Sequence, residues 1–203
     1  MVKKLNLIQT KQKLIDKGLN TFTPLQFKEL FGVSEYSAQK FIHNYTKKGL
    51  FIKLRNGLYT LQDEEISVFQ VANKIYSPSY ISLETALSYY SIIPENVYSV
   101  TSVTSKPTRE FNALDLSFTY SGIKRSCFCG YYLRKDDNNS FLIAEPEKAL
   151  ADYLYLVSLN KKNLNQRLDT AKINKRKLKE WGNLFNSPKL NTLISDICSP
   201  SRK

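Results

Sequence analysis

The sequence predicts an α/β protein of the α+β type. We expect an N-terminal winged helix-turn-helix domain over residues 1–61, then a mixed α/β C-terminal domain over residues 62–203 with a helical tail. Two observations predict this order. Three helix-like segments and a tight hairpin fill the first 61 residues. Segments rich in β-branched and aromatic residues then alternate with amphipathic stretches, and after residue 160 the chain becomes rich in lysine.

The first two helices are predicted from apolar spacing and from capping residues. An imperfect apolar stripe runs from Leu5 to Ile15 and stops before Gly18. Thr23 before Pro24 is typical of an N-cap followed by proline at the first helical position. The helix that follows, PLQFKELF, is expected to bury four apolar side chains: Leu25, Phe27, Leu30 and Phe31.

A third helix and a hairpin complete the first domain. Ser34 is expected to cap the helix and Gly49 to end it. The segments LFIKL, RNG and LYTL then predict a strand, a turn that favours positive φ, and a returning strand. The spacing i, i+3, i+4, i+7 gives the helix one apolar face, made of Ala38, Phe41, Ile42 and Tyr45.

The opposite face of the third helix is predicted to contact duplex DNA. Because successive residues of a helix are 100° apart, the polar and basic side chains lie away from the apolar face. Glu35, at the first position of the helix, is the one acidic residue on this face. Such a helix fits a major groove, and the hairpin brings further cations to the backbone or minor groove. A helix face that is merely solvated is the alternative. The expected contacts are Lys40, Asn44, Lys47, Lys53 and Arg55, with Tyr36, Ser37, His43 and Lys48 as further candidates.

Charge agrees with a polyanion partner. The net charge is +12, and 42% of the residues are hydrophobic, which is enough for a packed core. Residues 1–61 hold 11 Lys/Arg and 3 Asp/Glu, residues 62–159 hold 8 and 12, and residues 160–203 hold 11 and 3. The change of sign near residues 60–67 (TLQDEEIS) marks the expected domain boundary. Phosphate contacts release counterions and so favour basic segments, although lysines that only keep the surface soluble would give the same total.

The second domain is predicted to be a small mixed sheet packed by helices. ISVFQVANKIY, the segment after Ser82 and EPEKALADYLYLVSL are expected to be helical, with Ser82 as an N-cap. A short strand is expected just before Ser82, at the start of YISLETALSYYSIIPE. Further strands are expected at VYSVTSVTS, LDLSFTY, CFCGYYLR and SFLIA.

The residue inventory argues against an enzyme. His43 is the only histidine and lies on the proposed DNA face, which makes a Ser-His-Asp or Cys-His site improbable. Cys127 and Cys129 lack partners at metal-ligand spacing, and alternation in a strand would turn both sulfurs to one face. No glycine-rich phosphate loop and no nucleotidyltransferase signature is found. We therefore expect no catalytic residue, no metal site and no cofactor.

The chain resembles the AbiEi family over roughly residues 5–160. The motifs are NGLYTL, YISLETALSYYSIIPE, VTS with Arg109-Glu110-Phe111, and IAEPEKALADYLYL; Ser91 stands where many relatives have glycine. Members of this family are antitoxins and transcriptional autorepressors of type IV toxin–antitoxin systems, which act in abortive infection and phage defence. The resemblance implies that the winged helix binds operator repeats in double-stranded DNA. It also implies that the C-terminal domain opposes a nucleotidyltransferase-like toxin without forming a stable complex.

The tail, residues 160–203, carries a second basic cluster. We expect it to extend the DNA footprint or to serve antitoxicity, and a solvated helical face is the alternative. Its members are Lys161, Lys162, Arg167, Lys172, Lys175, Arg176, Lys177 and Lys179.

Two other functions stay open: a metabolite-responsive winged-helix transcriptional regulator, and a module whose acidic middle binds a basic protein. A cytoplasmic location without membrane contact is expected on three grounds. No apolar run approaches the roughly 20 residues that span a bilayer, the first residues lack the apolar stretch of a signal peptide, and three cysteines suit a reducing compartment.

Overall fold

The computed structural model describes residues 5–62, 67–95, 98–136 and 139–199, and the protein is a mixed α/β molecule of two compact units. The N-terminal unit comprises residues 1–67 together with residues 111–115, and the C-terminal unit comprises the rest. The expected boundary at residues 60–67 includes residues 63–66, which lie outside the described residues.

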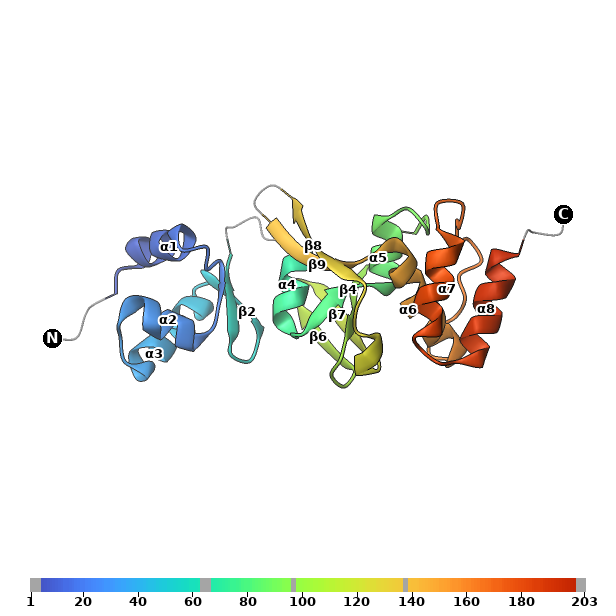
Figure 1. The fold of residues 1–203 in the computed structure, drawn as a ribbon. Coiled ribbons are helices and arrows are strands. Elements are labelled where there is room, and N and C mark those ends of the chain that lie inside the picture. The colour runs from blue at the N-terminus through green and yellow to red at the C-terminus, as the bar shows by residue number, and fades with distance from the viewer. Residues whose placement is uncertain (1–4, 63–66, 96–97, 137–138, 200–203) are drawn as a thin grey trace. The chain divides into compact units, whose positions relative to one another are not determined.

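The N-terminal unit contains three helices and a small antiparallel sheet (Figure 1). The sheet has the order β1-β3-β2, so that β3 pairs with both neighbours. The short strand β1, which pairs with the end of the hairpin, was not predicted. The elements are α1 (Leu7–Asp16), β1 (Thr21–Phe22), α2 (Pro24–Phe31), α3 (Glu35–Lys47), β2 (Phe51–Arg55) and β3 (Leu58–Leu61).

Local sequence explains where these helices and the turn begin and end. The Thr23 side chain accepts a hydrogen bond from the Gln26 amide, and the Gln26 side chain accepts one from the Thr23 amide, which completes a capping box. The Ser34 side chain accepts a hydrogen bond from the Ser37 amide and so caps α3, and Gly32 ends α2 in a left-handed conformation. Gly57 has a φ of 73° in the hairpin turn, as the turn residues predict. The predicted caps and turn are therefore confirmed.

One core of apolar side chains joins the elements of the N-terminal unit. Phe22 of β1 lies against Phe27 of α2 and Phe51 of β2, with ring centroids 5.7 and 5.2 Å apart. The expectation that Leu25 is buried is wrong, because its side chain is 59% exposed. Leu25 precedes Phe27 by two residues, about 200° around the helix, and therefore points away from the core. The fully or nearly fully buried members are Leu14, Phe22, Phe27, Phe31, Ala38, Ile42, Phe51 and Leu61.

The second sheet has six strands in the order β6-β7-β5-β4-β9-β8. It forms the framework of the C-terminal unit, although residues 111–113 at the end of its edge strand β6 belong to the N-terminal unit. β5 runs parallel to β7 and β4 runs parallel to β9, while the β4–β5 and β8–β9 pairs are antiparallel. The strands are β4 (Ser79–Ile81), β5 (Ser99–Thr104), β6 (Arg109–Ala113), β7 (Leu116–Gly122), β8 (Tyr131–Asp136) and β9 (Asn139–Ala144). The helices are α4 (Val68–Ile75), α5 (Leu83–Tyr89), the short 3-10 helix η1 (Arg125–Cys127), α6 (Pro146–Ser158), α7 (Lys175–Asn183) and α8 (Pro188–Cys198).

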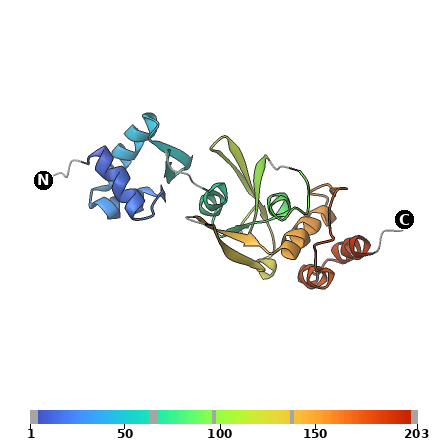
Figure 2. The same cartoon turned by 90° about the horizontal axis from the view of Figure 1, so that it is seen from above.

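Helices cover both faces of this sheet (Figure 2). The Tyr120 hydroxyl donates to a carbonyl of α4, whereas the Tyr80 hydroxyl donates to Asp152 of α6. Tyr80 is opposite Val103 and Tyr120 is opposite the preceding residue, Ser102, so the two tyrosines lie on opposite faces. α4 therefore covers one face and α6 the other, with α7 and α8 packed against α6. Trp181 of α7 lies so close to Gly130 that a Cβ there would be 2.9 Å from its ring.

Several predictions for this unit need correction. Strand β6 was not expected, and Cys127 belongs to η1 with its thiol donating to the Leu184 carbonyl, so Cys127 and Cys129 do not alternate in one strand. Ser82 does occupy the N-cap position of α5, but its side chain makes no capping hydrogen bond. The tail is not helical throughout, because α7 begins only at Lys175 and residues 159–174 form turns and irregular segments.

No helix within the described ranges combines the length and the apolar character needed to cross a bilayer. The same ranges hold no cluster of three or more His, Cys, Asp or Glu side chains arranged to ligate a metal ion.

Candidate nucleic-acid interface

The outer face of α3 carries the side chains that the sequence predicted to be exposed. Tyr36 is 72% exposed, and Lys40, His43, Asn44 and Lys47 are exposed along the same helix. The ammonium of Lys40 lies 5.7 Å from the centre of the Tyr36 ring, so these two side chains support each other. The helix thus presents a row of polar side chains that the described part of its own unit leaves exposed.

The inner face of α3 explains why the outer face is held in place. Ala38 and Ile42 are buried, and the Phe41 ring packs 5.5 Å from Phe27 and 4.3 Å from Tyr45. Rotation of the helix about its axis would expose this apolar face. Burial of the inner face therefore fixes the direction of the outer side chains.

Two candidates on α3 have other neighbours. Ser37 is half-buried, and its hydroxyl accepts a hydrogen bond from the hydroxyl of the N-cap Ser34 at 2.9 Å. Lys48 is exposed but lies over the Tyr45 ring at 5.3 Å, next to the apolar face. Both lie at the edges of the row formed by Lys40, His43 and Lys47.

The β2–β3 hairpin follows α3 directly and carries the other two predicted cations. Lys53 is exposed, and Arg55 is half-buried beside the turn. The Arg55 Nη1 donates to the Asn56 carbonyl at 2.8 Å, and the strand register shifts between Lys53 and Arg55. This irregularity bends the edge strand locally, and the Arg55 side chain is held against the turn.

Carboxylates are scarce around these cations. Residues 5–62 contain three acidic residues, Asp16, Glu29 and Glu35. Glu35 lies at the first position of α3, where it accepts a hydrogen bond from Gln39 and favours the helix dipole. Within the described residues, Lys40, Lys47 and Lys53 form no ion pair. Their charges therefore remain available to an anionic ligand.

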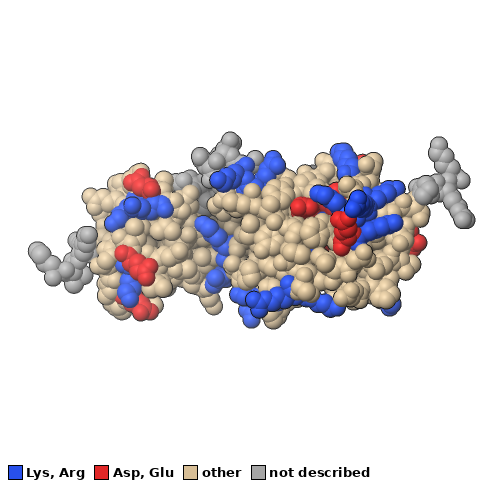
Figure 3. Space-filling model, in the orientation of Figure 1, with Lys and Arg blue, Asp and Glu red and all other residues tan. Residues whose placement is uncertain are grey.

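The second basic cluster, in the tail, is spread over different elements. Four of its members lie in the turns before α7, and four lie on α7. Lys162 pairs with Glu84 at 2.5 Å, Arg167 with Glu95 at 3.4 Å, and Lys177 with Glu145 at 3.7 Å. The remaining members are Lys161 and Lys172, both exposed, Lys175, which donates to the Cys198 carbonyl, Arg176, which pairs with the exposed Glu180, and Lys179, also exposed. On the face in Figure 3, Lys and Arg side chains gather over this part of the C-terminal unit, with acidic side chains among them.

A further group of cations, which the sequence did not predict, lies at the ends of two neighbouring strands of the six-stranded sheet. β5 and β7 are parallel and end side by side at Thr104 and Gly122, so the loops after them meet. Four exposed cations lie in or beside these loops: Lys106, Arg109, Lys124 and Arg125. Lys106 and Arg109 flank the Tyr76 ring at 5.5 and 5.9 Å. The sequence alone does not predict this group, because the four cations come together only through the pairing of β5 with β7.

A buried polar cluster was also missed. Lys148 and Asp152, one turn apart on α6, are both fully buried and form an ion pair. Asp152 Oδ2 accepts hydrogen bonds from the hydroxyls of Tyr80 at 3.0 Å and Ser82 at 2.9 Å. Lys148 also donates to the Tyr80 hydroxyl and lies over the Phe185 ring. The sequence feature that could have predicted this ion pair is the pair of opposite charges at i and i+4 in a largely apolar helix.

Neither the models of known protein families nor the curated proteins give a match to this chain.

Proposed function

We propose that the N-terminal unit is a winged helix-turn-helix that binds duplex DNA, with α3 in the major groove and the β2–β3 hairpin as the wing against the backbone. The order of its elements, three helices and then a hairpin in a sheet β1-β3-β2, supports this proposal. We further propose that the protein represses its own toxin–antitoxin operon and is the antitoxin of a nucleotidyltransferase-like toxin. The resemblance to the AbiEi family supports this role.

The observation that carries DNA binding is the outer face of α3, which is cationic and has no acidic residue beyond its first position. Lys40, Lys47 and Lys53 are exposed and unpaired with any described carboxylate. Asn44 and His43 lie among them and offer groups that can read base edges. A face that combines phosphate-binding and base-reading groups suits a specific duplex site better than a general polyanion.

The test is a titration of the full chain with fluorescent duplex DNA from upstream of its own gene, at several salt concentrations. We expect Lys40→Ala and Lys53→Ala each to weaken binding, because each removes a phosphate contact. Each loss should make the slope of log affinity against log salt shallower by about 0.9. The variants should keep the circular dichroism of the wild type, because both side chains are exposed.

Lys17→Ala is the matched control, because Lys17 is an exposed lysine at the C-cap of α1 and belongs to neither α3 nor the β2–β3 hairpin. It should leave affinity and salt slope nearly unchanged. If Lys40→Ala and Lys53→Ala behave like Lys17→Ala, the proposed DNA face is wrong.

The antitoxin role is tested separately by co-expression with the product of the adjacent gene, if that product is nucleotidyltransferase-like. The Lys40→Ala, Lys53→Ala double variant should still restore growth while it no longer represses the operon, because the resemblance assigns antitoxicity to the C-terminal domain. Loss of both activities in this folded variant would contradict that division of labour.

A further inference from the structure

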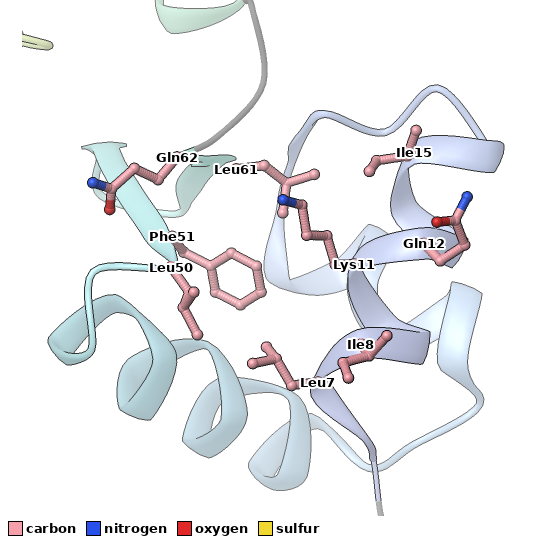
Figure 4. A pocket seen from close by; sticks show the side chains of 9 residues that line it. All are labelled: Leu7, Ile8, Lys11, Gln12, Ile15, Leu50, Phe51, Leu61 and Gln62. Carbon is pink, nitrogen blue, oxygen red and sulfur yellow. The ribbon is translucent and has the colours of Figure 1, made fainter.

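A pocket of about 380 Å³ in the N-terminal unit is mainly apolar, and its lining does not define one ligand. Figure 4 shows this pocket between α1 and the β2–β3 hairpin, with Ile8, Ile15 and Phe51 among the side chains that line it. Many apolar groups fit such a surface equally well, because the hydrophobic effect has no preferred direction.

The cations at the ends of β5 and β7 restrict a partner more closely, and we call them the strand-end patch. Neighbouring strands lie about 4.8 Å apart, so the loops that follow β5 and β7 start side by side. The loops also contact each other. The Gly122 amide donates to Thr108 Oγ1 at 3.0 Å, and a Cβ on Gly122 would be 2.6 Å from the Lys106 carbonyl oxygen. The patch consists of Lys106 and Arg109 after β5, and Lys124 and Arg125 after β7.

Neutral partners hold three of the four side chains in place. Lys106 Nζ donates to a backbone carbonyl at 2.6 Å and lies 5.5 Å from the centre of the Tyr76 ring. The Arg109 guanidinium lies 5.9 Å from the centre of the same ring. Lys124 Nζ donates to a carbonyl in the turn after α7 at 3.3 Å. These contacts orient the cations without neutralising their charges.

No carboxylate in the described residues forms an ion pair with the strand-end patch. Glu110 is adjacent to Arg109 in β6, so the two side chains point to opposite faces of the strand, and Glu110 Oε1 accepts from the Ser117 hydroxyl at 2.9 Å. In Figure 3, Lys and Arg side chains follow one another along the lower edge of the C-terminal unit without an acidic side chain between them. The patch is therefore an exposed positive surface.

This arrangement suits the phosphates of a nucleic-acid strand better than a single small anion. The four cations are exposed and spread over two loops, whereas a small ligand is typically enclosed in a cleft. Guanidinium groups bind phosphate through paired N–H donors, and ammonium groups bind it as point charges. The phosphates of one strand follow each other regularly, so adjacent loops contact consecutive groups. A long polyanion also gains from the net charge of +12 on the whole chain.

We propose that the strand-end patch binds the phosphate backbone of a nucleic-acid strand, independently of base sequence and of the α3 face. Phosphate contacts position a strand but do not read its bases. The patch is therefore a second binding site, which goes beyond the proposed operator recognition by α3. Its loss should lower affinity for every sequence by a similar factor.

Fluorescence anisotropy of a labelled oligothymidylate of about 12 nucleotides, titrated with the full chain at several salt concentrations, tests this proposal. The starting protein carries Lys40→Ala and Lys53→Ala, so that the α3 face contributes little. We expect Arg109→Gln and Arg125→Gln together to weaken binding about tenfold. The slope of log affinity against log salt should become shallower by about 1.4, which is about 0.7 for each lost contact. A shuffled duplex should lose affinity by a similar factor.

Lys135→Gln is the matched control for each single variant, because Lys135 is an exposed lysine of β8, at the opposite edge of the sheet from β6. It should change neither the affinity nor the salt slope. All variants should keep the circular dichroism of the starting protein, because the substituted side chains are exposed. In the chain with Lys40 and Lys53 intact, preference for the operator over a shuffled duplex reports separately on α3 and should persist without the patch.

Three results would overturn the proposal. The first is a double variant, Arg109→Gln with Arg125→Gln, that binds oligothymidylate like Lys135→Gln. The second is a loss of affinity confined to the operator duplex. The third is a polyglutamate of equal charge that binds as tightly as oligothymidylate and loses as much affinity in the double variant, which would assign the patch to an acidic protein.

Discussion

Asp152 is the most completely enclosed charge-bearing side chain of the C-terminal unit, together with its partner Lys148. Full burial raises the pKa of the Asp152 carboxyl, and contact with Lys148 and with the hydroxyls of Ser82 and Tyr80 opposes that rise. Burial and the nearby Asp152 charge likewise raise the pKa of the Tyr80 hydroxyl. Each member of this cluster is therefore stabilised by the others, and loss of one member leaves the rest without partners.

We expect Asp152→Leu and Lys148→Met, made singly, each to lower the free energy of unfolding by about 3–5 kcal/mol, because each leaves one buried charge unpaired. The double variant should recover much of this loss, since two apolar side chains of similar size leave no charge behind. Urea unfolding of the full chain, followed by circular dichroism, measures these differences.

The control for this pair is Glu180→Gln, which breaks the Arg176–Glu180 pair at the same spacing on α7. Those side chains are 90% and 60% exposed, so Glu180→Gln should leave the free energy of unfolding nearly unchanged. The prediction is contradicted if the free energy of unfolding that the double variant loses equals the sum of the losses in the two single variants.

At the scale of helices and strands, the sequence predicted most of what local chemistry decides. Thr23, Ser34 and Gly57 act through neighbours two or three residues away, so the caps and the hairpin turn were predicted correctly. The apolar spacing likewise identified the inner face of α3, including Ala38 and Ile42. The exposure of Tyr36, Lys40, His43, Asn44 and Lys47 on the outer face of α3 follows from that same spacing.

Features that depend on distant partners could not be predicted. Strand β1 exists because Thr21 and Phe22 pair with Thr60 and Tyr59, some forty residues later. Ser82 was expected to cap α5, but its hydroxyl donates instead to Asp152, which a one-dimensional pattern does not reveal. The same holds for the cations near the ends of β5 and β7, because only the sheet order brings them together.

Gly182 gives a prediction for the packing of α7 against α8. A Cβ at this position would overlap Cδ1 of the buried Ile194. Helix propensity alone would make Gly182→Ala stabilising by about 1 kcal/mol, whereas overpacking costs typically 1–3 kcal/mol. We expect a net loss of stability, measured as a lower urea midpoint.

Ile194→Val removes the overlapping methyl group and should rescue the variant. The double variant Gly182→Ala, Ile194→Val is expected to be more stable than Gly182→Ala alone, although Ile194→Val by itself lowers stability slightly. If Gly182→Ala is more stable than the wild type, helix propensity outweighs packing at this contact.

For the whole molecule, charge is distributed unevenly along the chain. Residues 1–61 and 160–203 are both strongly basic, but their cations have different surroundings. Lys40, Lys47 and Lys53 form no ion pair within the described residues. Three cations of the tail, in contrast, pair with Glu84, Glu95 and Glu145. Equal net charge therefore does not imply equal ability to bind phosphate.

We predict that the tail adds a smaller, sequence-independent part of any DNA affinity. Neutralising Lys172, Arg176 and Lys179 to glutamine should reduce affinity for specific and shuffled duplexes by similar factors and make the salt slope shallower. Lys162→Gln is a useful comparison, because its charge is already paired with Glu84 and should contribute little. An unchanged salt slope in the triple variant would confine the DNA footprint to other parts of the chain.

The close approach of Trp181 to Gly130 has a practical consequence, because this is the only tryptophan in the sequence. Its indole lies where α7 meets the segment leading into β8, beside the stem of Lys148. Tryptophan fluorescence therefore reports on the packing of α7 and should change when α7 detaches. The N-terminal unit contains no tryptophan and does not contribute to this emission.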